Sequence, residues 1–309
     1  YAGQADKLEG QTLPLDKTDM FAYTTHEPLG VVAAIIPWNS PMYLTAVKLA
    51  PALAAGNTVV LKPSEHASAT ILELMHLVQE AGFPDGVVNV VTGLGVDTGS
   101  ALTKHPLVRR IAFTGGGEGA KSVIKNSAEN LAQVSLELGG KSPNIIFEDA
   151  DIGSAVNGVI AGIFAASGQS CVAGSRLLVQ DTVYDEFLTA LKTRAAGIII
   201  GDPLDPTSEM GPMATQTQLT LVERMVATAL AQGAELIHGG KRAAVAGDGW
   251  YFEPTILAVD DNQCSIMQKE VFGPVASIMR FKDEAEALAL ANDTEFGLAG
   301  YIQGELSHA

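Results

Sequence analysis

The stretch VVAAIIPWNSPMYLTAVKLAPALAAGNTVVLKPSE (residues 31–65) contains the pattern that decides the fold. An apolar run at 31–36 is followed by a helical pattern over 43–55 and by a second apolar, β-branched run at 58–61. Strands without polar interruptions that alternate with helices are typical of a parallel sheet covered by helices on both faces. We therefore expect a doubly wound, Rossmann-like α/β sheet.

The alternation continues along the chain. Further strands are expected at 87–91, 110–113 and 133–137, and further helices at 67–80, 98–104 and 118–127. After the glycine-rich segment ELGGKSP (137–143), a second α/β unit is expected, with strands at 143–147, 176–180, 235–238 and 255–259 and helices at 151–166, 183–196 and 215–232. Residues 11–28 are polar and predict an isolated hairpin. Such a hairpin either contacts another subunit or is a plain surface hairpin.

Composition excludes several classes of function. The 309 residues carry a net charge of −16, which disfavours nucleic acid or an anionic membrane surface as a partner. No apolar run has the length of a membrane span, and two distant cysteines make no disulfide framework, so a soluble protein of a reducing compartment, the cytoplasm, is expected. The histidines form no ligand pair, and no metal site is expected. They are His26, His66, His76, His105, His238 and His308.

The loops that follow the predicted strands point to a ligand site. They read PWNSP, KPSE, TGLG, TGGGEG and LGGKS, and each carries glycine, proline or a polar group. In a doubly wound sheet, ligands bind beyond the carboxyl ends of the strands. These loops therefore predict a cofactor-binding edge.

Two of these loops carry candidate cofactor contacts. FTGGGEGA (113–120) places a glycine-rich turn at a helix start, which suits a pyrophosphate, although a tight strand-to-helix turn would have the same composition. The segment is neither a Walker A loop nor a GxGxxG motif. In KPSE, Lys62 and Glu65 provide a cation and a carboxylate for ribose hydroxyls; a solvated pair at a helix start is the alternative.

Two further residues carry candidate chemistry. Cys171 in SGQSCVAGS is, from its neighbours alone, either a structural thiol or a nucleophile whose partners are distant in sequence. Glu137 ends an expected buried strand, where a carboxylate is costly unless it is paired or functional.

Taken together, these motifs resemble the aldehyde dehydrogenase superfamily. The matching segments are PWNSP, VVLKPSE, FTGG, LELGGKSPNIIF, GQSCVAGSR and EVFGPV (270–275), in one order over nearly the whole chain. The resemblance implies residues 1–28 as a partial helix and oligomerisation-type hairpin, 29–139 as an NAD(P)-binding domain and 140–309 as a catalytic domain. Family members are longer at both ends, so an incomplete chain is expected.

The resemblance also implies roles for individual residues. Cys171 would attack the aldehyde carbon, the Asn39 amide and the Cys171 N–H would hold the oxyanion, and Glu137 would activate the water that hydrolyses the thioester. The implied cofactor-binding residues are Trp38, Lys62, Ser64, Glu65, Gly95, Gly115, Gly116, Glu270 and Phe272. NAD is favoured because the Glu65 carboxylate would repel a 2′-phosphate, and NADP remains an alternative.

The implied activity is oxidation of a small-molecule aldehyde to the carboxylic acid by a homo-oligomer, a dimer or a tetramer. The sequence departs from the family pattern at three positions. In the phosphate loop, Gly116 stands where the family usually has a serine and Ala120 where it usually has a glycine. Ser40 stands where an aromatic residue is common. Two rival functions stay open. One is a thiol hydrolase or acyltransferase without a nicotinamide, and the other is an inactive truncated fragment.

Overall fold

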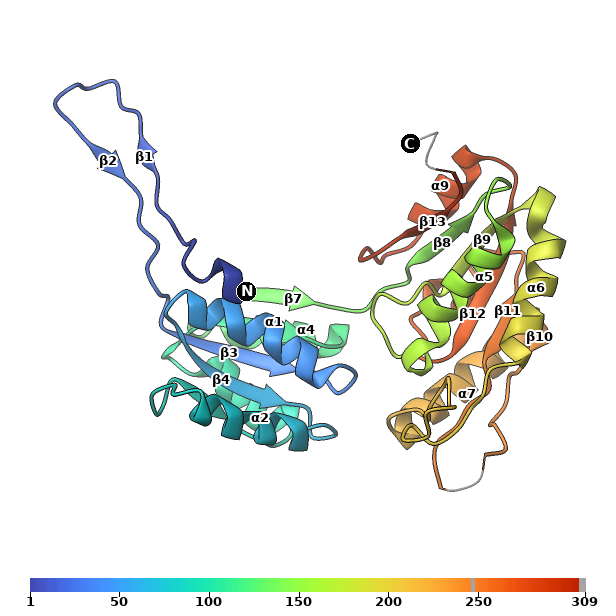
Figure 1. Ribbon diagram of the computed structural model, residues 1–309, viewed down its shortest axis with the longest axis horizontal. Helices are drawn as coiled ribbons and strands as arrows, with labels where there is room; N and C mark the ends of the chain where they lie inside the picture. Colours follow the sequence, from blue (N-terminus) through green and yellow to red (C-terminus); the bar gives the residue numbers. More distant parts are fainter. Residues whose placement is uncertain (246–247, 306–309) are drawn as a thin grey trace. The chain divides into compact units, whose positions relative to one another are not determined.

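The computed structural model describes residues 1–245 and 248–305. The chain divides into two compact units, Tyr1–Leu138 and Gly139–Ala309. Each unit is built on a sheet of mainly parallel strands with helices packed against it (Figure 1). This confirms the α/β fold that the sequence predicts.

The sheet of the first unit has five parallel strands in the order β5-β4-β3-β6-β7. The strands are β3 (Val31–Ile36), β4 (Thr58–Pro63), β5 (Val88–Val90), β6 (Val108–Thr114) and β7 (Gln133–Glu137). The helices are α1 (Pro41–Ala54), α2 (Ala69–Glu80), α3 (Ser100–Lys104) and α4 (Gly117–Ser127), with a π-helical turn at Gly95–Gly99 before α3. A 3-10 turn at Ala2–Gln4 and an antiparallel pair, β1 (Thr12–Leu13) and β2 (Ala22–Tyr23), precede β3.

Side-chain alternation along β3 explains the two helical layers. Val32, Ala34 and Ile36 pack with α1 and α2, whereas Ala33 packs in a separate cluster with α3 and α4. Successive side chains of a strand point to opposite faces, so a strand that is apolar throughout must be covered on both faces. The central position of β3 follows from this composition.

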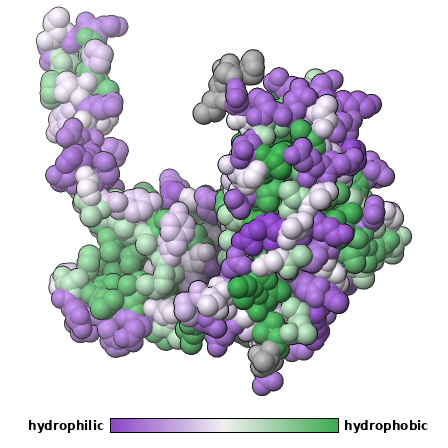
Figure 2. All heavy atoms as spheres, turned by 45° about the vertical axis from the view of Figure 1, so that its right-hand side comes forward, coloured by the Kyte–Doolittle hydropathy of each residue, from purple (hydrophilic) through white to green (hydrophobic). Residues whose placement is uncertain are grey.

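The hairpin predicted at 11–28 is present as β1 and β2, and its apolar side chains face solvent. Leu13, Met20, Phe21 and Tyr23 are all exposed, and Figure 2 shows apolar and polar residues interspersed in this segment. The hairpin therefore contributes no fully buried residue to the core of the first unit.

The second unit contains a six-stranded sheet in the order β10-β11-β12-β9-β8-β13, parallel except for the β10–β11 pair. The strands are β8 (Pro143–Ile146), β9 (Arg176–Gln180), β10 (Glu235–His238), β11 (Thr255–Ala258), β12 (Val275–Phe281) and β13 (Tyr301–Gln303). The helices are α5 (Ile152–Val159), α6 (Tyr184–Ala196), α7 (Gln216–Ala231), α8 (Ser265–Gln268) and α9 (Glu284–Asn292). Shorter turns lie at Ile160–Phe164, Ala165–Gly168 and Asp181–Val183.

The strand β9 divides the apolar core of this unit. Leu177 and Val179 pack with α5 and α6, whereas Leu178 packs with α7, α8 and α9 on the other face. All three side chains are fully buried, so β9 is a central strand of the sheet.

Several predicted elements differ from the structure. The helix expected at 151–166 is regular only over α5, and continues as a π-helical turn and a left-handed segment. The strand β12 and the helix α9 were not predicted. Glu137, expected at the end of a buried strand, is exposed, because β7 is an edge strand with half-buried residues. Among the described residues, no helix is long and apolar enough to cross a membrane.

Candidate active site

In the first unit, the carboxyl ends of the parallel strands bring most of the predicted cofactor residues to one edge of the sheet. Lys62 lies on β4, Trp38 and Asn39 follow β3, Gly115 and Gly116 follow β6, and Glu137 ends β7. These strands are neighbours in the sheet. The edge is therefore the place where a doubly wound sheet binds ligands.

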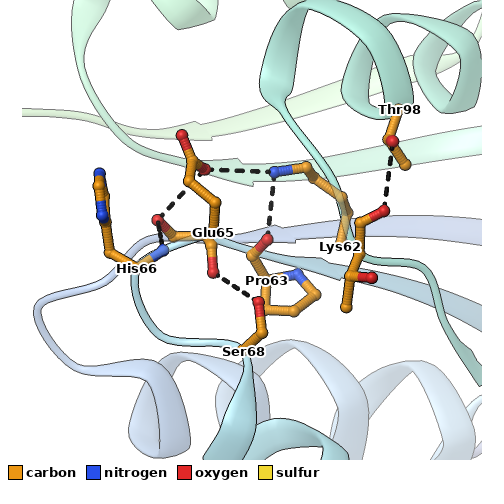
Figure 3. Close-up of polar contacts among 8 residues, drawn as sticks. Lys62, Pro63, Glu65, His66, Ser68 and Thr98 are labelled. Carbon is orange, nitrogen blue, oxygen red and sulfur yellow. Dashed lines mark hydrogen bonds and ion pairs between the residues drawn. The ribbon is translucent and has the colours of Figure 1, made fainter.

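Lys62 and Glu65 form a charged pair on this edge (Figure 3). The Lys62 side chain is almost fully buried, and its Nζ lies 3.1 Å from the carbonyl oxygen of Pro63 and 3.7 Å from Glu65 Oε2. The Glu65 side chain is 43% exposed, so it remains open to a ligand. Ser64 connects to this pair through its hydroxyl, 3.5 Å from Glu65 Oε2.

Glycine positions on this edge leave room for a ligand. A Cβ at Gly116, the residue before α4, or at Gly95 would meet no atom within 4 Å. At Gly115, by contrast, a Cβ would lie 2.7 Å from the ring of Phe113, so only glycine fits. The backbone N–H groups at the start of the 11-residue helix α4 therefore stay accessible to an anion.

Lys48 is a functional candidate of the first unit that the sequence did not suggest. It lies on α1 and its Nζ donates to Thr114 Oγ1 at 2.6 Å. Burial lowers the pKa of Lys48, and the nearby Glu137 carboxylate opposes part of that shift. The main chain of Glu137 is fixed by the N–H of Gly115, which donates to its carbonyl oxygen at 3.1 Å.

In the second unit, Cys171 is half-buried and follows a left-handed segment. Ala166, Ser167 and Gly168 all have positive φ, at 49°, 54° and 69°. Non-glycine residues in this region are strained and concentrate at functional sites. The Ser167 hydroxyl holds the segment by donating to the carbonyl oxygen of Gly211 at 2.7 Å.

The neighbours of the Cys171 segment are held by close backbone contacts. A Cβ on Gly140 would lie 2.7 Å from the Cys171 carbonyl oxygen, and a Cβ on Gly168 would lie 2.0 Å from that of Gly273. The Tyr301 hydroxyl donates to the carbonyl oxygen of Val172 at 2.7 Å. These contacts fix the main chain on both sides of the thiol.

Glu270 and Phe272 lie on the loop before β12, in the same unit as Cys171. The Glu270 carboxylate accepts a hydrogen bond from the Gly140 N–H at 3.0 Å, and its pKa is raised by burial. Phe272 has a φ of +55°, and its carbonyl oxygen accepts a hydrogen bond from Gln218 Nε2. Gln218 was not found from the sequence, because its contact spans 54 residues.

The predicted site residues thus form two groups. The first unit contains Asn39, Glu137 and most of the predicted cofactor residues. The second unit contains Cys171 and the other two predicted cofactor residues, Glu270 and Phe272. Within the described residues, no group of three or more His, Cys, Asp or Glu side chains could hold a metal ion. His308 lies outside the described residues.

Comparison with known proteins bears on both groups. The family model described as "Aldehyde dehydrogenase family" matches residues 1–308. The chain is 54% identical to (Z)-2-((N-methylformamido)methylene)-5-hydroxybutyrolactone dehydrogenase of Acinetobacter baylyi over 313 residues, covering 100% of this chain and 63% of the relative. It is 43% identical to human retinal dehydrogenase 2, covering 98% of this chain and 58% of the relative.

Solved structures show the same similarity. A point mutant of betaine aldehyde dehydrogenase from Staphylococcus aureus, in complex with NAD+, has a TM-score of 0.96 and 41% identity, covering 99% of this chain and 62% of that one. PnpE in complex with nicotinamide adenine dinucleotide also has a TM-score of 0.96, with 43% identity over 99% of this chain and 63% of that one. The chain therefore spans less than two thirds of the length of these relatives.

Proposed function

The chain belongs to the aldehyde dehydrogenase family, and on that premise we propose that the protein oxidises an aldehyde to the carboxylic acid with NAD. The proposal concerns the whole protein, since the chain spans 63% of its relative from Acinetobacter baylyi. The observation that carries it is the ligand edge of the first unit, where a buried cation, a carboxylate and open glycine backbone lie on one parallel sheet.

The residues of this edge fit the chemistry of a dinucleotide. The Lys62–Glu65 pair offers a donor and an acceptor for the two hydroxyls of a ribose. The N–H groups that begin α4, next to Gly116, suit a pyrophosphate despite the net charge of the chain. We favour NAD over NADP because the exposed Glu65 carboxylate would repel a 2′-phosphate.

We assign the chemical steps to three residues. The Cys171 thiolate adds to the aldehyde carbon, and the carbonyl oxygen becomes an oxyanion held by the Asn39 amide and the Cys171 N–H. The oxyanion then collapses to a carbonyl as the former aldehyde carbon loses a hydride, for which bound NAD would supply the acceptor. Cys171 is left carrying the acyl group as a thioester. Glu137 takes a proton from water, which attacks the thioester carbon; the C–S bond breaks and releases the acid and the thiolate.

The remaining contacts position these groups. We propose that Glu270 accepts hydrogen bonds from the nicotinamide ribose and that Phe272 and Trp38 line the cofactor site. Gln218 supports this arrangement by donating to the carbonyl oxygens of Val271 and Phe272 at 2.9 and 3.0 Å. We propose that Gly95 gives the cofactor room, because its surroundings are open.

We also propose a homo-oligomer that works in the cytoplasm. The exposed apolar side chains of the β1–β2 hairpin provide a surface for a second copy of the chain. Cys171 and Cys264 are not joined in a disulfide, in keeping with a reducing compartment.

The experiment is a panel of aldehydes, including retinal and betaine aldehyde, mixed with the protein and NAD while the absorbance of the reduced cofactor is followed. We expect acid and reduced cofactor in equal amounts, and no turnover with Cys171→Ala. Turnover that survives this substitution would contradict the assigned nucleophile. Release of acid from an ester or thioester without NAD, together with no oxidation of any aldehyde, would instead favour the rival thiol hydrolase.

A second measurement separates the two half-reactions. In Glu137→Gln, we expect a single burst of reduced cofactor followed by slow release of acid, since the acyl group forms but is not hydrolysed. Acid release at the parent rate would show that another group activates the water. A chain that binds neither NAD nor aldehyde would support the inactive-fragment alternative.

A further inference from the structure

Lys141 is a buried cation for which the proposed reaction has no role. The residue is 2% exposed, and among the described residues its Nζ has no hydrogen-bond partner. Burying an ammonium group without a direct partner is costly, so its protonation depends strongly on the charged groups around it.

The groups around Lys141 show what it acts on. The Glu270 carboxylate attracts its charge, the Arg176 guanidinium repels it, and Cys264 also lies near it. The Arg176 guanidinium is already used, since it donates to the carbonyl oxygens of Lys141, Leu290 and Ala291. Among these groups, Glu270 is the one carboxylate that acts on Lys141. Burial lowers the pKa of Lys141 to about 7, so its charge changes near neutral pH.

The Glu270 carboxylate lies against the turn that leads into Lys141. Its Oε1 accepts from the Gly140 N–H at 3.0 Å, and a Cβ on Gly139 would lie 2.1 Å from its Oε2. Only glycine at 139 leaves room for the carboxylate in this position. Burial raises the pKa of Glu270, whereas the Gly140 N–H and the charge of Lys141 lower it.

We propose that Lys141 is a positioning residue: its buried ammonium, on the residue that follows the Gly139–Gly140 turn, keeps the Glu270 carboxylate ionised and held on that turn for the cofactor. This inference rests on the proposed function, in which Glu270 accepts hydrogen bonds from ribose hydroxyls. An ionised carboxylate offers only acceptors, whereas a protonated one loses part of that capacity.

The same turn is also close to the proposed nucleophile. Gly140 lies so near the Cys171 carbonyl oxygen that a Cβ would approach to 2.7 Å. Gly140 therefore lies close both to the Glu270 carboxylate, which accepts from its N–H, and to the main chain that carries the thiol.

The first test measures the ionisation of Glu270 without any cofactor. Carboxyl-labelled glutamate is followed by 13C NMR against pH in the parent chain, Lys141→Met and Lys141→Arg, and the signal is assigned with Glu270→Gln. We expect Lys141→Met to raise the Glu270 midpoint by about one pH unit and Lys141→Arg to leave it low. Lys192→Met, at an exposed position of α6, is the matched control and should change nothing.

The second test measures NAD binding by calorimetry across the same pH range. With Lys141→Met, we expect NAD binding to weaken progressively as the pH falls through the Glu270 midpoint, by at most about tenfold for a shift of about one pH unit. We expect less than about twofold weakening at high pH, where Glu270 is ionised in both proteins. Equal weakening at every pH would indicate a merely structural role and overturn the inference. An unchanged Glu270 midpoint in Lys141→Met would also overturn it.

Two further outcomes keep the tests decisive. If Lys141→Met does not fold, the titration of the parent chain decides alone. The 13C signal of Glu270 must then show a second inflection near neutral pH, where Lys141 loses its proton. If the second inflection is absent, Lys141 and Glu270 are not coupled and the inference is refuted. If the parent chain binds no NAD at any pH, the proposed function fails at this site, while the NMR titration still decides whether Lys141 controls Glu270.

Discussion

Gly168, three residues before the proposed nucleophile, should be irreplaceable even by alanine. Its φ is +69°, and an added Cβ would lie 2.0 Å from the carbonyl oxygen of Gly273, 2.3 Å from its carbonyl carbon and 2.8 Å from the nitrogen of Pro274. All three atoms belong to the main chain, so no side chain can rotate away to relieve the contact. The substitution must displace the segment before β12 or the segment before Cys171.

The cost of Gly168→Ala has two parts. Holding alanine in the left-handed region costs about 1–2 kcal/mol, and forcing a methyl group into a filled space costs about 1–3 kcal/mol more. The free energy of unfolding of the second unit should therefore fall by about 2–5 kcal/mol. Gly162→Ala is the matched control, because a Cβ there meets no atom within 4 Å and its φ is not positive. It should change the free energy by less than about 1 kcal/mol.

Urea unfolding measures this difference. The chain has two tryptophans, and in a Trp38→Phe background the fluorescence of Trp250 reports on the second unit alone. We expect Gly168→Ala to lower the transition midpoint with an unchanged slope, and Gly162→Ala to leave both unchanged. If the two variants unfold at the same urea concentration, the close contact with Gly273 does not constrain the segment, and the reasoning is refuted.

Three further predictions follow from contacts described above. Lys62→Met removes the cation beside Glu65 and should weaken NAD binding about tenfold or more, as measured by calorimetry. Below about pH 7, the folded chain carries the full cost of burying the charged Lys141, and this cost fades at higher pH as the folded state loses the proton. Between about pH 7 and 9, the free energy of unfolding of the parent should therefore rise relative to that of Lys141→Met by at most about 1.4 kcal/mol per pH unit, as measured by urea unfolding. A difference that does not change with pH would contradict this. Thr215→Ala removes the hydroxyl that accepts from the Gln218 N–H at the start of α7, and should cost about 1 kcal/mol in the same assay; no loss would show that water replaces the cap.

The fold was predictable where the pattern is local. The strands at 31–36, 133–137 and 176–180 were predicted with the bounds that the structure has. The end of the helix after Val159 was not, because the sequence at 160–168 is apolar and small, and a single glycine such as Gly162 is also found inside helices. Tertiary contacts, such as the Ser167 hydrogen bond to Gly211, decide that segment.

The site was predictable only in part. Lys62 and Glu65 are three residues apart, so their pairing follows from the order of residues at the end of β4. Lys48 and Lys141 were missed, because nothing next to them in sequence marks Lys48 as half-buried or Lys141 as buried. The contact of Lys48 with Thr114 spans 66 residues, and Lys141 faces Glu270, which lies in a distant loop. Burial of a cation is a property of the fold and has no local signature.

The pairing of β8 with β13 has a consequence for how the protein is made. Asp149, just after β8, accepts through its Oδ2 from the N–H of Glu305, 156 residues later. During synthesis at about 5–20 residues per second, β8 therefore waits about 8–30 s with one edge unpaired before β13 leaves the ribosome. Through that interval the backbone groups of β8 can pair with another nascent chain, so the second unit should depend on chaperones while it is being translated.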